Sequence, residues 1–481
     1  MIQPAQRIVT WLAAGAVSVL AAGCTVGPNY HPPATTIPSG WVGTATTRPT
    51  TQGSLPVEQQ VELARWWTVF HDPQLESLID RAIQDNLDLR QAEVRVRQAR
   101  AQRRVVAAGL WPTVDTNGSY RRAGSTDSSA TDLFRAGLDA AWELDIFGGN
   151  RRSVEAAEAE IQSTIEDQRD VLVTLVSEVA LTYLDLRGFQ REIEIANANL
   201  EDQRRSFDLT KRRQQGGFVS GLDVANAQSL VAGTEAGIPL LESNERQTIY
   251  ALAFLLGEEP AALIEELSKP GQIPRVPENI PVGLPSDLLR RRPDIRRADA
   301  NVHAATARIG VATADLFPRF NLAGSLAYQS NNVNSLFDSA AGTWSIGPSV
   351  SWPLFSAGSI RANIAVQNAA HEQALLAYRS TVLGALRDVE VALVAYVKEQ
   401  QHRALLQESE IANRRAVDLS TQLYTQGQTD FLNVLAAQRA LLNSQDALVQ
   451  SDRILAQELI ALYKALGGGW QLESPATQPA P

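Results

Sequence analysis

Sulfur-containing residues are almost absent from this sequence of 481 residues, in which Cys24 is the single cysteine and Met1 the single methionine. One cysteine excludes a disulfide bond within the chain, and one methionine argues against a methionine-based copper relay. The five histidines lack the spacing of metal ligands, so we expect no zinc site. We find no phosphate-binding glycine-rich loop and no nucleophilic serine motif, which indicates that the protein is not an enzyme.

Basic residues are outnumbered, because 43 Lys and Arg stand against 53 Asp and Glu and give a net charge of −10. Binding to nucleic acid phosphates requires an excess of basic residues, so we expect no nucleic-acid partner. The acidity fits two interpretations equally well. It favours cations if the acidic side chains line a lumen, or it only keeps the protein soluble.

Long hydrophobic runs are missing after the first residues of the chain. The apolar run Ile8–Gly23 has 16 residues and follows Arg7, which is typical of a signal peptide over residues 1–23. It is short for a membrane-spanning helix. If the remaining chain crosses a membrane, it must do so as a β-barrel, because only helices and closed barrels satisfy their backbone groups in lipid.

The signal peptide ends in the string LAAGC, which resembles the bacterial lipobox. The resemblance implies cleavage before Cys24 and a covalent lipid on it, as N-palmitoyl and S-diacylglycerol groups. Ala21 stands where Leu is more usual, and an ordinary signal peptide with an incidental cysteine is the alternative. Thr25 follows in place of the Asp that retains such lipoproteins at the inner membrane, which favours the outer membrane.

The chain contains an internal repeat. Asp88, Ala92, Val96 and Pro112 match Asp294, Ala298, Val302 and Pro318, each 206 positions later, and Asp208, Gly217 and Gly257 match Asp418, Gly427 and Gly467, each 210 positions later. A period of about 200 residues is too long for a solenoid. It indicates the duplication of one module, and each copy reads as helix, strand, strand, long helix and return helix.

In the first copy we expect an amphipathic helix from about Pro73 to Gly109, then strands at about 112–122 and 134–147. In the second strand apolar and charged residues alternate, with Trp142 on one face and Glu143 on the other, which predicts one apolar and one polar face. The second copy repeats the pattern at about 318–329 and 343–355, where Pro348 removes a ladder donor and we expect a bulge or a strand end to accommodate it.

Glycine-marked turns release each strand pair into a long helix, predicted at about 151–213 and 361–425, with return helices at about 221–256 and 431–466. Gly237 and Pro239 predict a kink in the first return helix. Four strands cannot close a barrel, so the strands either close across several chains or do not lie in a membrane. Three chains give twelve strands with a wide lumen, whereas two give eight strands whose interior side chains fill it.

Three motifs resemble those of the TolC/OprM-type outer-membrane efflux family, in particular its NodT-like lipoprotein branch, from Cys24 to about Gly467. The string after Cys24 carries Gly27, Pro28, Tyr30 and Pro32. A second motif carries Trp66, Trp67, Phe70, Asp72, Pro73, Leu75, Leu78, Ala82 and Asn86. A third carries Leu284, Pro285, Leu288, Leu289, Arg291, Arg292, Pro293, Asp294 and Ile295.

The resemblance implies a mostly α fold with a membrane β-barrel part, in which a homotrimer forms a twelve-stranded β-barrel and a long periplasmic α-barrel. It implies a passive exit duct for small toxic compounds in a multidrug efflux pump, anchored in outer-membrane lipid. The partners would be a periplasmic adaptor and an inner-membrane pump of the resistance-nodulation-division (RND) class. We expect a signal peptide at 1–23, an anchor and equatorial segment at 24–72, repeats at 73–257 and 286–466, a proline-rich linker at 258–285 and a disordered tail at 467–481.

The two turns between the long and the return helices resemble the family's tip loops. Candidate adaptor contacts are Gly217, Val219, Ser220, Leu222, Gly427, Phe431 and Leu432. The glycines and Ser220 alternatively only cap helices. Relatives carry an aspartate where this chain has Ala436, so the candidates for a closed gate are Asp223, Asp430 and Leu435. An anionic ring in a pore binds cations and disfavours anions.

Other interpretations stay open. The run Arg290–Arg292 with Arg296 and Arg297 is read as a solvated helix start paired with Asp287 and Asp294, rather than as a binding site. Trp142, Tyr328, Trp344 and Trp352 form either aromatic belts at the membrane interface or contacts between protomers. A protein-secretion outlet of an ABC-type exporter and a helical periplasmic scaffold without a pore are the alternative functions.

Overall fold

The structure is a computed structural model that describes residues 25–35, 38, 40–42, 63–126, 128–276 and 287–470. Cys24 and the signal peptide lie outside the described residues. The described chain forms two compact units. Unit 1 holds residues 25–35, Val94–Glu166 and Arg296–Thr381, and unit 2 holds the rest. No described helix has the length and apolar character needed to cross a membrane.

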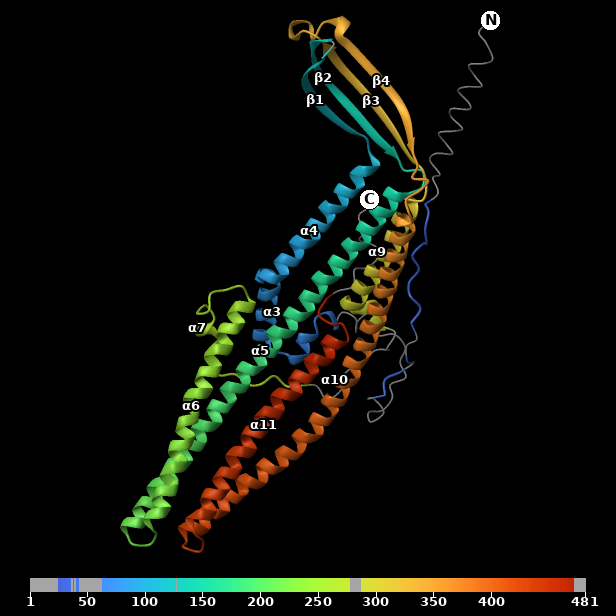
Figure 1. Cartoon of the computed structure of the whole chain (residues 1–481). Coiled ribbons are helices and arrows are strands. Elements are labelled where there is room, and N and C mark those ends of the chain that lie inside the picture. Colours follow the sequence, from blue (N-terminus) through green and yellow to red (C-terminus); the bar gives the residue numbers. More distant parts are fainter. Residues whose placement is uncertain are drawn as a thin grey trace. The chain divides into compact units, whose positions relative to one another are not determined.

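The repeat is visible in the order of the elements (Figure 1). The first copy consists of α3 (Pro73–Asp85), α4 (Leu87–Ala107), β1 (Thr113–Ser125), β2 (Ser128–Leu144), α5 (Gly149–Gln215) and α6 (Gly221–Leu255). The second consists of α8 (Leu288–Arg291), α9 (Pro293–Ala314), β3 (Arg319–Ser330), β4 (Gly342–Ser351), α10 (Ser359–Thr425) and α11 (Phe431–Ala465). Short helices are η2 (Trp66–Phe70), η3 (Ala108–Leu110), α7 (Ile264–Leu267), η5 (Val333–Ser335) and η6 (Ser339–Ala341).

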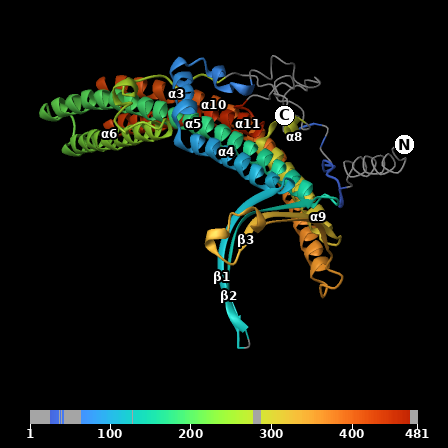
Figure 2. The ribbon, with the colours of Figure 1, turned by 90° about the horizontal axis from the view of Figure 1, so that it is seen from above.

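Unit 1 carries one antiparallel sheet in the order β1-β2-β3-β4, and Figure 2 shows its long strands β1 and β2 bending along their length. The register aligns Leu138 with Leu326 and Leu326 with Trp344, whereas Glu143 lies opposite Asn321. Residues directly opposite each other share a face. The sheet therefore has one apolar and one polar face, as the alternation predicts.

The place of β4 at the edge of the sheet explains how a strand accommodates Pro348. The expected bulge or strand end at Pro348 is wrong, because Pro348 lies inside β4 in continuous register, opposite Leu322 of β3. Instead, β4 is an edge strand of the sheet in the single chain. An edge strand tolerates proline where no neighbour needs its missing donor. Two tryptophans tie the sheet to the preceding helical segments. The Nε1 atoms of Trp142 in β2 and of Trp352, directly after β4, donate to the carbonyls of Leu110 and Leu316, both at 3.0 Å.

The N-terminal strap, residues 25–30, lies on α9 within unit 1. Its Gly27 packs so closely on Gly310 that an added Cβ would meet the Gly310 Cα at 2.5 Å. Tyr30 stacks on His303 with ring centroids 4.3 Å apart, and its hydroxyl donates to Asp299 at 2.5 Å. Burial and the neighbouring carboxylate raise the pKa of Tyr30. The N-terminal motif therefore serves to seat the strap.

Unit 2 shows that the prediction of a single helix from 73 to 109 is wrong, because the helix breaks at Asn86. This residue is extended, with φ −60° and ψ 129°. Its side chain accepts a hydrogen bond from the Leu89 amide at 2.9 Å and donates to the Leu255 carbonyl at 2.8 Å. The first bond caps α4, and the second ties the break to the end of α6.

The second copy has an equivalent break at Arg292, which follows Asn86 by 206 positions. Arg292 bonds the carbonyl of Ala465, 210 positions after Leu255, and pairs with Asp294 at 2.7 Å and Asp388 at 3.4 Å. The expected solvated helix start is therefore wrong here, although the expected pairing with Asp294 is found. The neighbouring Arg291 is buried, and burial lowers its pKa.

The disordered tail predicted from residue 467 is wrong for Gly467–Trp470. Gly467 has φ +75° and packs against the backbone of Arg291, where a Cβ would meet atoms at 3.1 Å. Trp470 is 8% exposed and donates from Nε1 to the Arg291 carbonyl at 3.0 Å. Glycine tolerates this left-handed turn, which ends α11. Residues 471–481 lie outside the described chain.

The core of unit 2 is built around the equatorial motif. Trp66 and Trp67 are buried, and Trp66 stacks on Tyr463 of α11 with ring centroids 5.7 Å apart. Asp72 caps α3 by accepting from the amides of Gln74 and Leu75. Its other oxygen accepts from the hydroxyl of Tyr183 on α5 at 2.7 Å. This motif thus joins α3, α5 and α11 within one unit.

Candidate functional site

The two hairpin turns of unit 2 lie at the same end of their helices (Figure 1). In tip 1, residues 216–223, Gly217 has φ +79° and the Phe218 amide donates to the Arg213 carbonyl at 2.9 Å. In tip 2, residues 426–432, Gly427 has φ +75° and the Gln428 amide donates to the Leu423 carbonyl. Both bonds close the end of a long helix, and the left-handed residue requires glycine.

The return helix of tip 1 starts with a side-chain cap. The carboxylate of Asp223 accepts hydrogen bonds from the amide and from the hydroxyl of Ser220, both at 3.0 Å. These bonds satisfy an amide at the beginning of α6, where no helical carbonyl is available. Asp223, a gate candidate, is therefore engaged in capping within the single chain.

Tip 2 is capped differently, although the backbone is the same. Asp430 has N-cap geometry, but within the described chain its side chain accepts no hydrogen bond at this cap. The nearby Asn433 donates instead to the hydroxyl of Thr429 at 2.7 Å. Asp430 is exposed. Its carboxylate is thus available at the tip surface, unlike that of Asp223.

A hydrophobic cluster joins the two tips from the inside. It consists of Ala227, Leu230, Tyr424, Phe431, Val434 and Leu435, with Phe207, Leu209 and Val219 packed against it. Phe431 and Leu435 are each 3% exposed. Within one chain these two residues, expected as an adaptor contact and a constriction, pack against the neighbouring helices instead of facing solvent.

Arg213 connects the cluster to the end of α10, and sequence reasoning missed it. Its Nη1 atom donates to the carbonyl of Tyr424, and its guanidinium lies 4.5 Å from the centroid of the Tyr424 ring. Tyr424 is buried and reaches the hydroxyl of Thr210 on α5 at 3.4 Å. A basic residue in the last turn of a helix commonly bonds free carbonyls. That signal does not reveal that the carbonyls belong to the other hairpin.

Buried polar groups continue from the tips along α5 and α11. Gln438 donates to the hydroxyl of Ser206 at 2.9 Å, and Asn199 donates to Gln445 at 2.7 Å. The amide of Gln203 is buried and has no hydrogen-bond partner among the described residues. An unpaired buried amide is costly, so this seam between the hairpins is less stable than an apolar one would be.

Farther along the same helices lies a group of acidic side chains. Arg453 lies near Asp185 and Glu192, with its Nε 3.6 Å from Asp185, and Asp446 is a further acidic neighbour of Glu192. Burial raises the pKa of all three carboxyl groups, and the nearby arginine opposes this only in part for Asp185 and Glu192. The seam therefore gains stability when protons are added.

The exposed part of the tips is small. Leu222 and Leu432 are 68% and 63% exposed, and Phe218, which sequence reasoning did not single out, is 75% exposed. Gly217, Ser220 and Gly427 are exposed as well. Three large apolar side chains in the turns of two hairpins are unusual for a free surface. This exposure makes the tips the candidate contact surface of unit 2.

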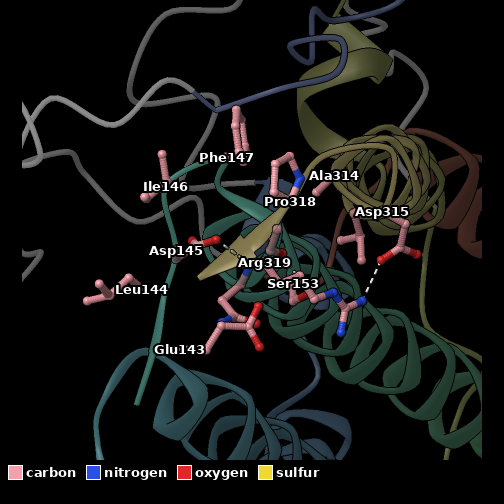
Figure 3. Close-up of a pocket in the computed structure, with 13 residues that line it drawn as sticks. Glu143, Leu144, Asp145, Ile146, Phe147, Ser153, Ala314, Asp315, Pro318 and Arg319 are labelled. Carbon is pink, nitrogen blue, oxygen red and sulfur yellow. Dashed lines mark hydrogen bonds and ion pairs between the residues drawn. The ribbon is translucent and has the colours of Figure 1, made fainter. Parts of the chain in front are cut away.

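Unit 1 contains a cavity of about 110 Å³ where the strands meet the helices (Figure 3). Its lining includes Glu143 on β2 and Asp315 before β3, which pairs with Arg319 at 2.5 Å. Asp145 also lines it and accepts from the first amides of α5, at Asn150 and Arg151. The cavity is acidic, but no group of His, Cys, Asp and Glu suited to a metal ion is found among the described residues.

Comparison with known proteins gives a consistent picture. The family model described as outer membrane efflux protein matches residues 78–258 and 284–468. Nodulation protein T of Rhizobium leguminosarum bv. trifolii is 33% identical over 460 residues, covering 94% of this chain and 96% of that protein. The pyoverdine export outer membrane protein OpmQ of Pseudomonas aeruginosa is 35% identical over 425 residues, covering 85% and 88%.

A solved structure of the outer-membrane channel OprN is similar over the whole fold. Its TM-score is 0.87 at 37% sequence identity, and the match covers 93% of this chain and 100% of that chain. The two segments that the family model matches coincide with the two repeats. The helices and strands observed here match the fold of the OprN channel.

Proposed function

The chain belongs to the outer membrane efflux protein family and is an outer-membrane channel for the export of compounds, and from this premise we propose that three copies form one duct. The proposed duct performs no chemistry of its own. It is anchored by lipid on Cys24, extends into the periplasm and carries small toxic compounds delivered by an RND-type pump through a periplasmic adaptor.

One observation carries the assembly: the two copies of the long helix differ in what covers them. On α5 one row of residues is buried, at Ala156, Glu166, Val173 and Leu184. The residues 210 positions later on α10 are 50–66% exposed, at Val366, Leu376, Leu383 and Val394. The repeat predicts the same kind of surface for both rows. A first repeat from another copy would cover the row on α10.

The strands lead to the same assembly. Both outer strands, β1 and β4, have a free edge in the single chain, and a free edge is not tolerated in lipid. Pairing β4 of one copy with β1 of the next removes both edges. Three copies then contribute twelve strands and leave a lumen, and the polar face with Glu143 lines it.

The assembly is tested by charge on the exposed row of α10. Leu383→Asp places a carboxylate at the proposed interface. Ile411→Asp is the matched control, because Ile411 is also exposed on α10 but its counterpart 210 positions earlier, Glu201, is exposed as well. Native mass in detergent should give a trimer for the wild type and the control and a monomer for L383D. A monomeric wild-type protein contradicts the proposal.

The tips are the proposed contact with the adaptor, which the exposed side chains of Leu222, Leu432 and Phe218 support. A photo-crosslinker at Ser220 or at the exposed Leu432 should capture a periplasmic adaptor in cells. The same probe at Glu235, exposed on α6 away from the turn, should not. Equal capture at all three positions contradicts a specific contact at the tips.

The lipid anchor is tested at Cys24 itself. Cys24→Ala in the precursor should abolish incorporation of radiolabelled palmitate, while Cys24 in the wild type carries the label. The close fit of Gly27 against Gly310 supports the anchor, because it holds the strap directly after the cysteine. Labelling of the C24A variant contradicts this assignment.

A further inference from the structure

The helices α4 and α9 are equivalent in the repeat, but only one of them is covered by the strap. On α9 the strap rests on His303 and Gly310. Arg152 of α5 holds it there by donating to Asn29 at 2.7 Å and to the Val26 carbonyl at 3.2 Å. The face of α9 is thus closed by a segment of the same chain.

The equivalent face of α4 carries arginines in place of these contacts. Arg97 and Arg104 stand 206 positions before His303 and Gly310, and Arg100 lies between them. The spacing i, i+3, i+7 puts all three on one face of the helix, and all three are exposed. No hydrogen bond or ion pair of theirs is found within the described residues, whereas the adjacent Arg103 pairs with Glu158 at 2.6 Å.

The strap on α9 shows where the arginine face of α4 lies relative to the sheet of unit 1. The strap begins beside the junction of strand and helix, where the Val26 amide donates to the Phe147 carbonyl at 3.1 Å. It therefore starts two residues after Cys24 at the end of the sheet. Gly27 reaches the level of Gly310, the counterpart of Arg104.

Two tryptophans lie next to the C-terminal end of α4. Trp111 directly follows η3 and is 72% exposed, and Trp142 bonds the Leu110 carbonyl. Tryptophan is enriched where a membrane meets water. Arg104 lies about 9 Å from Leu110 along the helix, at 1.5 Å per residue, and is the arginine of this face nearest to the tryptophans.

Helix α10 lacks the charged residues that surround the strap on α5. Around the strap, α5 contributes Arg152 and Glu155, and Glu155 lies 3.1 Å from His303. The residues 210 positions later on α10 are Ala362 and Ala365. Small apolar side chains leave space and provide no carboxylate. These positions of α10 therefore leave room for an anion from outside the protein.

We propose that the arginine face of α4, Arg97, Arg100 and Arg104, binds the phosphate headgroup of an anionic phospholipid at the periplasmic surface of the outer membrane. The guanidinium fork matches phosphate oxygens, and the tryptophans hold the acyl side of the interface. The lipid takes the place that the strap occupies on α9. This inference rests on the proposed outer-membrane assembly, and the test separates the two.

Purified trimers in detergent are titrated with phosphatidylglycerol or phosphatidylcholine and analysed by native mass spectrometry. The variant is R97Q/R100Q/R104Q. The control, K211Q/R212Q/R415Q, removes the same charge from exposed residues of α5 and α10 near the tips. We expect the wild type and the control to prefer phosphatidylglycerol, and the variant to lose this preference by roughly fivefold per arginine.

Several results would overturn the inference. Equal binding of both lipids by the wild type would show that the acyl chains alone are recognised. Displacement of phosphatidylglycerol by millimolar inorganic phosphate would assign the face to free phosphate. A variant that alone falls apart into monomers would assign it to the contact between copies. Monomers in every sample, the wild type included, would instead contradict the proposed trimer.

Discussion

Tip 1 and tip 2 have the same backbone at equivalent positions of the repeat, yet different side chains stabilise them. Tip 1 exposes Phe218 and caps its return helix with Asp223. Tip 2 buries Phe431 and leaves Asp430 without a capping bond in the described chain. Tip 1 is thus held locally, by its own cap. Tip 2 is held by the cluster shared with the other hairpin. When the hairpins separate, tip 2 therefore loses the contacts of its buried Phe431, whereas tip 1 loses only those of the partly buried Val219.

The largest expected effect comes from the two phenylalanines. Phe431→Ala removes a buried ring and should destabilise tip 2 by about 3–5 kcal/mol. Phe218→Ala removes an exposed ring and should change the stability by less than about 0.5 kcal/mol. Hydrogen exchange of the first amides of α11 and α6 measures both. Equal hydrogen-exchange protection in the two variants would contradict the difference between the tips.

Substitution of Arg213 is expected to have the next largest effect, because Arg213 joins the two hairpins to each other. Arg213→Gln removes the charged donor to the Tyr424 carbonyl and the contact with its ring, at a cost of about 1.5–3 kcal/mol. In planar bilayers R213Q should raise the open probability of the channel. Arg212→Gln, at an exposed neighbour, is the control. The same conductance change in both variants would refute the specific role of Arg213.

The caps give a smaller difference. Asp223→Ala removes two hydrogen bonds from the start of α6 and should cost about 1 kcal/mol. Asp430→Ala should cost less than about 0.5 kcal/mol. Faster hydrogen exchange at residues 221–225 in the first variant, with no change at 431–435 in the second, is the expected pattern. The reverse pattern would show that Asp430 is the true cap.

The smallest effect concerns pH. Folding raises the pKa of Asp185, Glu192 and Asp446 above their ordinary values of 3.8, 4.5 and 3.8. The folded chain then binds these protons more tightly than the unfolded chain. The stabilisation is complete below the ordinary values and is lost as the pH rises through the raised ones.

Thermal unfolding of the trimer measured from neutral to mildly acidic pH should therefore show a rising midpoint. Glu192→Gln with Asp446→Asn should flatten this dependence. The corresponding positions of the other hairpin are His402 and Ala236, so it lacks this group of carboxylates. A pH dependence that survives both substitutions would have to come from other groups.

Much of the fold follows from local patterns in the sequence. The offsets of 206 and 210 residues predict the two copies, and the alternation around Trp142 predicts the two faces of the sheet. The family motifs predict an outer-membrane efflux channel, which the relatives confirm. The break at Asn86 is not predicted, because its cause is a bond to the carbonyl of Leu255, 169 residues away.

The candidate site is less predictable than the fold. The sequence context of Gly217 and Gly427 predicts that they end helices, since a left-handed helix end requires glycine. Arg213 and Tyr424 were missed, because their contact joins two hairpins distant in sequence. The sequence singles out Phe431 and Leu435 as candidates, but it does not predict their burial, which is a property of the packed cluster.

Sequence alone therefore determines the elements of this protein, because periodicity and turn residues act over a few positions. It also determines the duplication. Only the tertiary structure decides which of two equivalent surfaces is covered. The α5 row is buried and the α10 row exposed, and the face of α9 carries the strap while that of α4 presents Arg97 and Arg104. Coverage depends on contacts between residues far apart in the chain, and no local pattern encodes it.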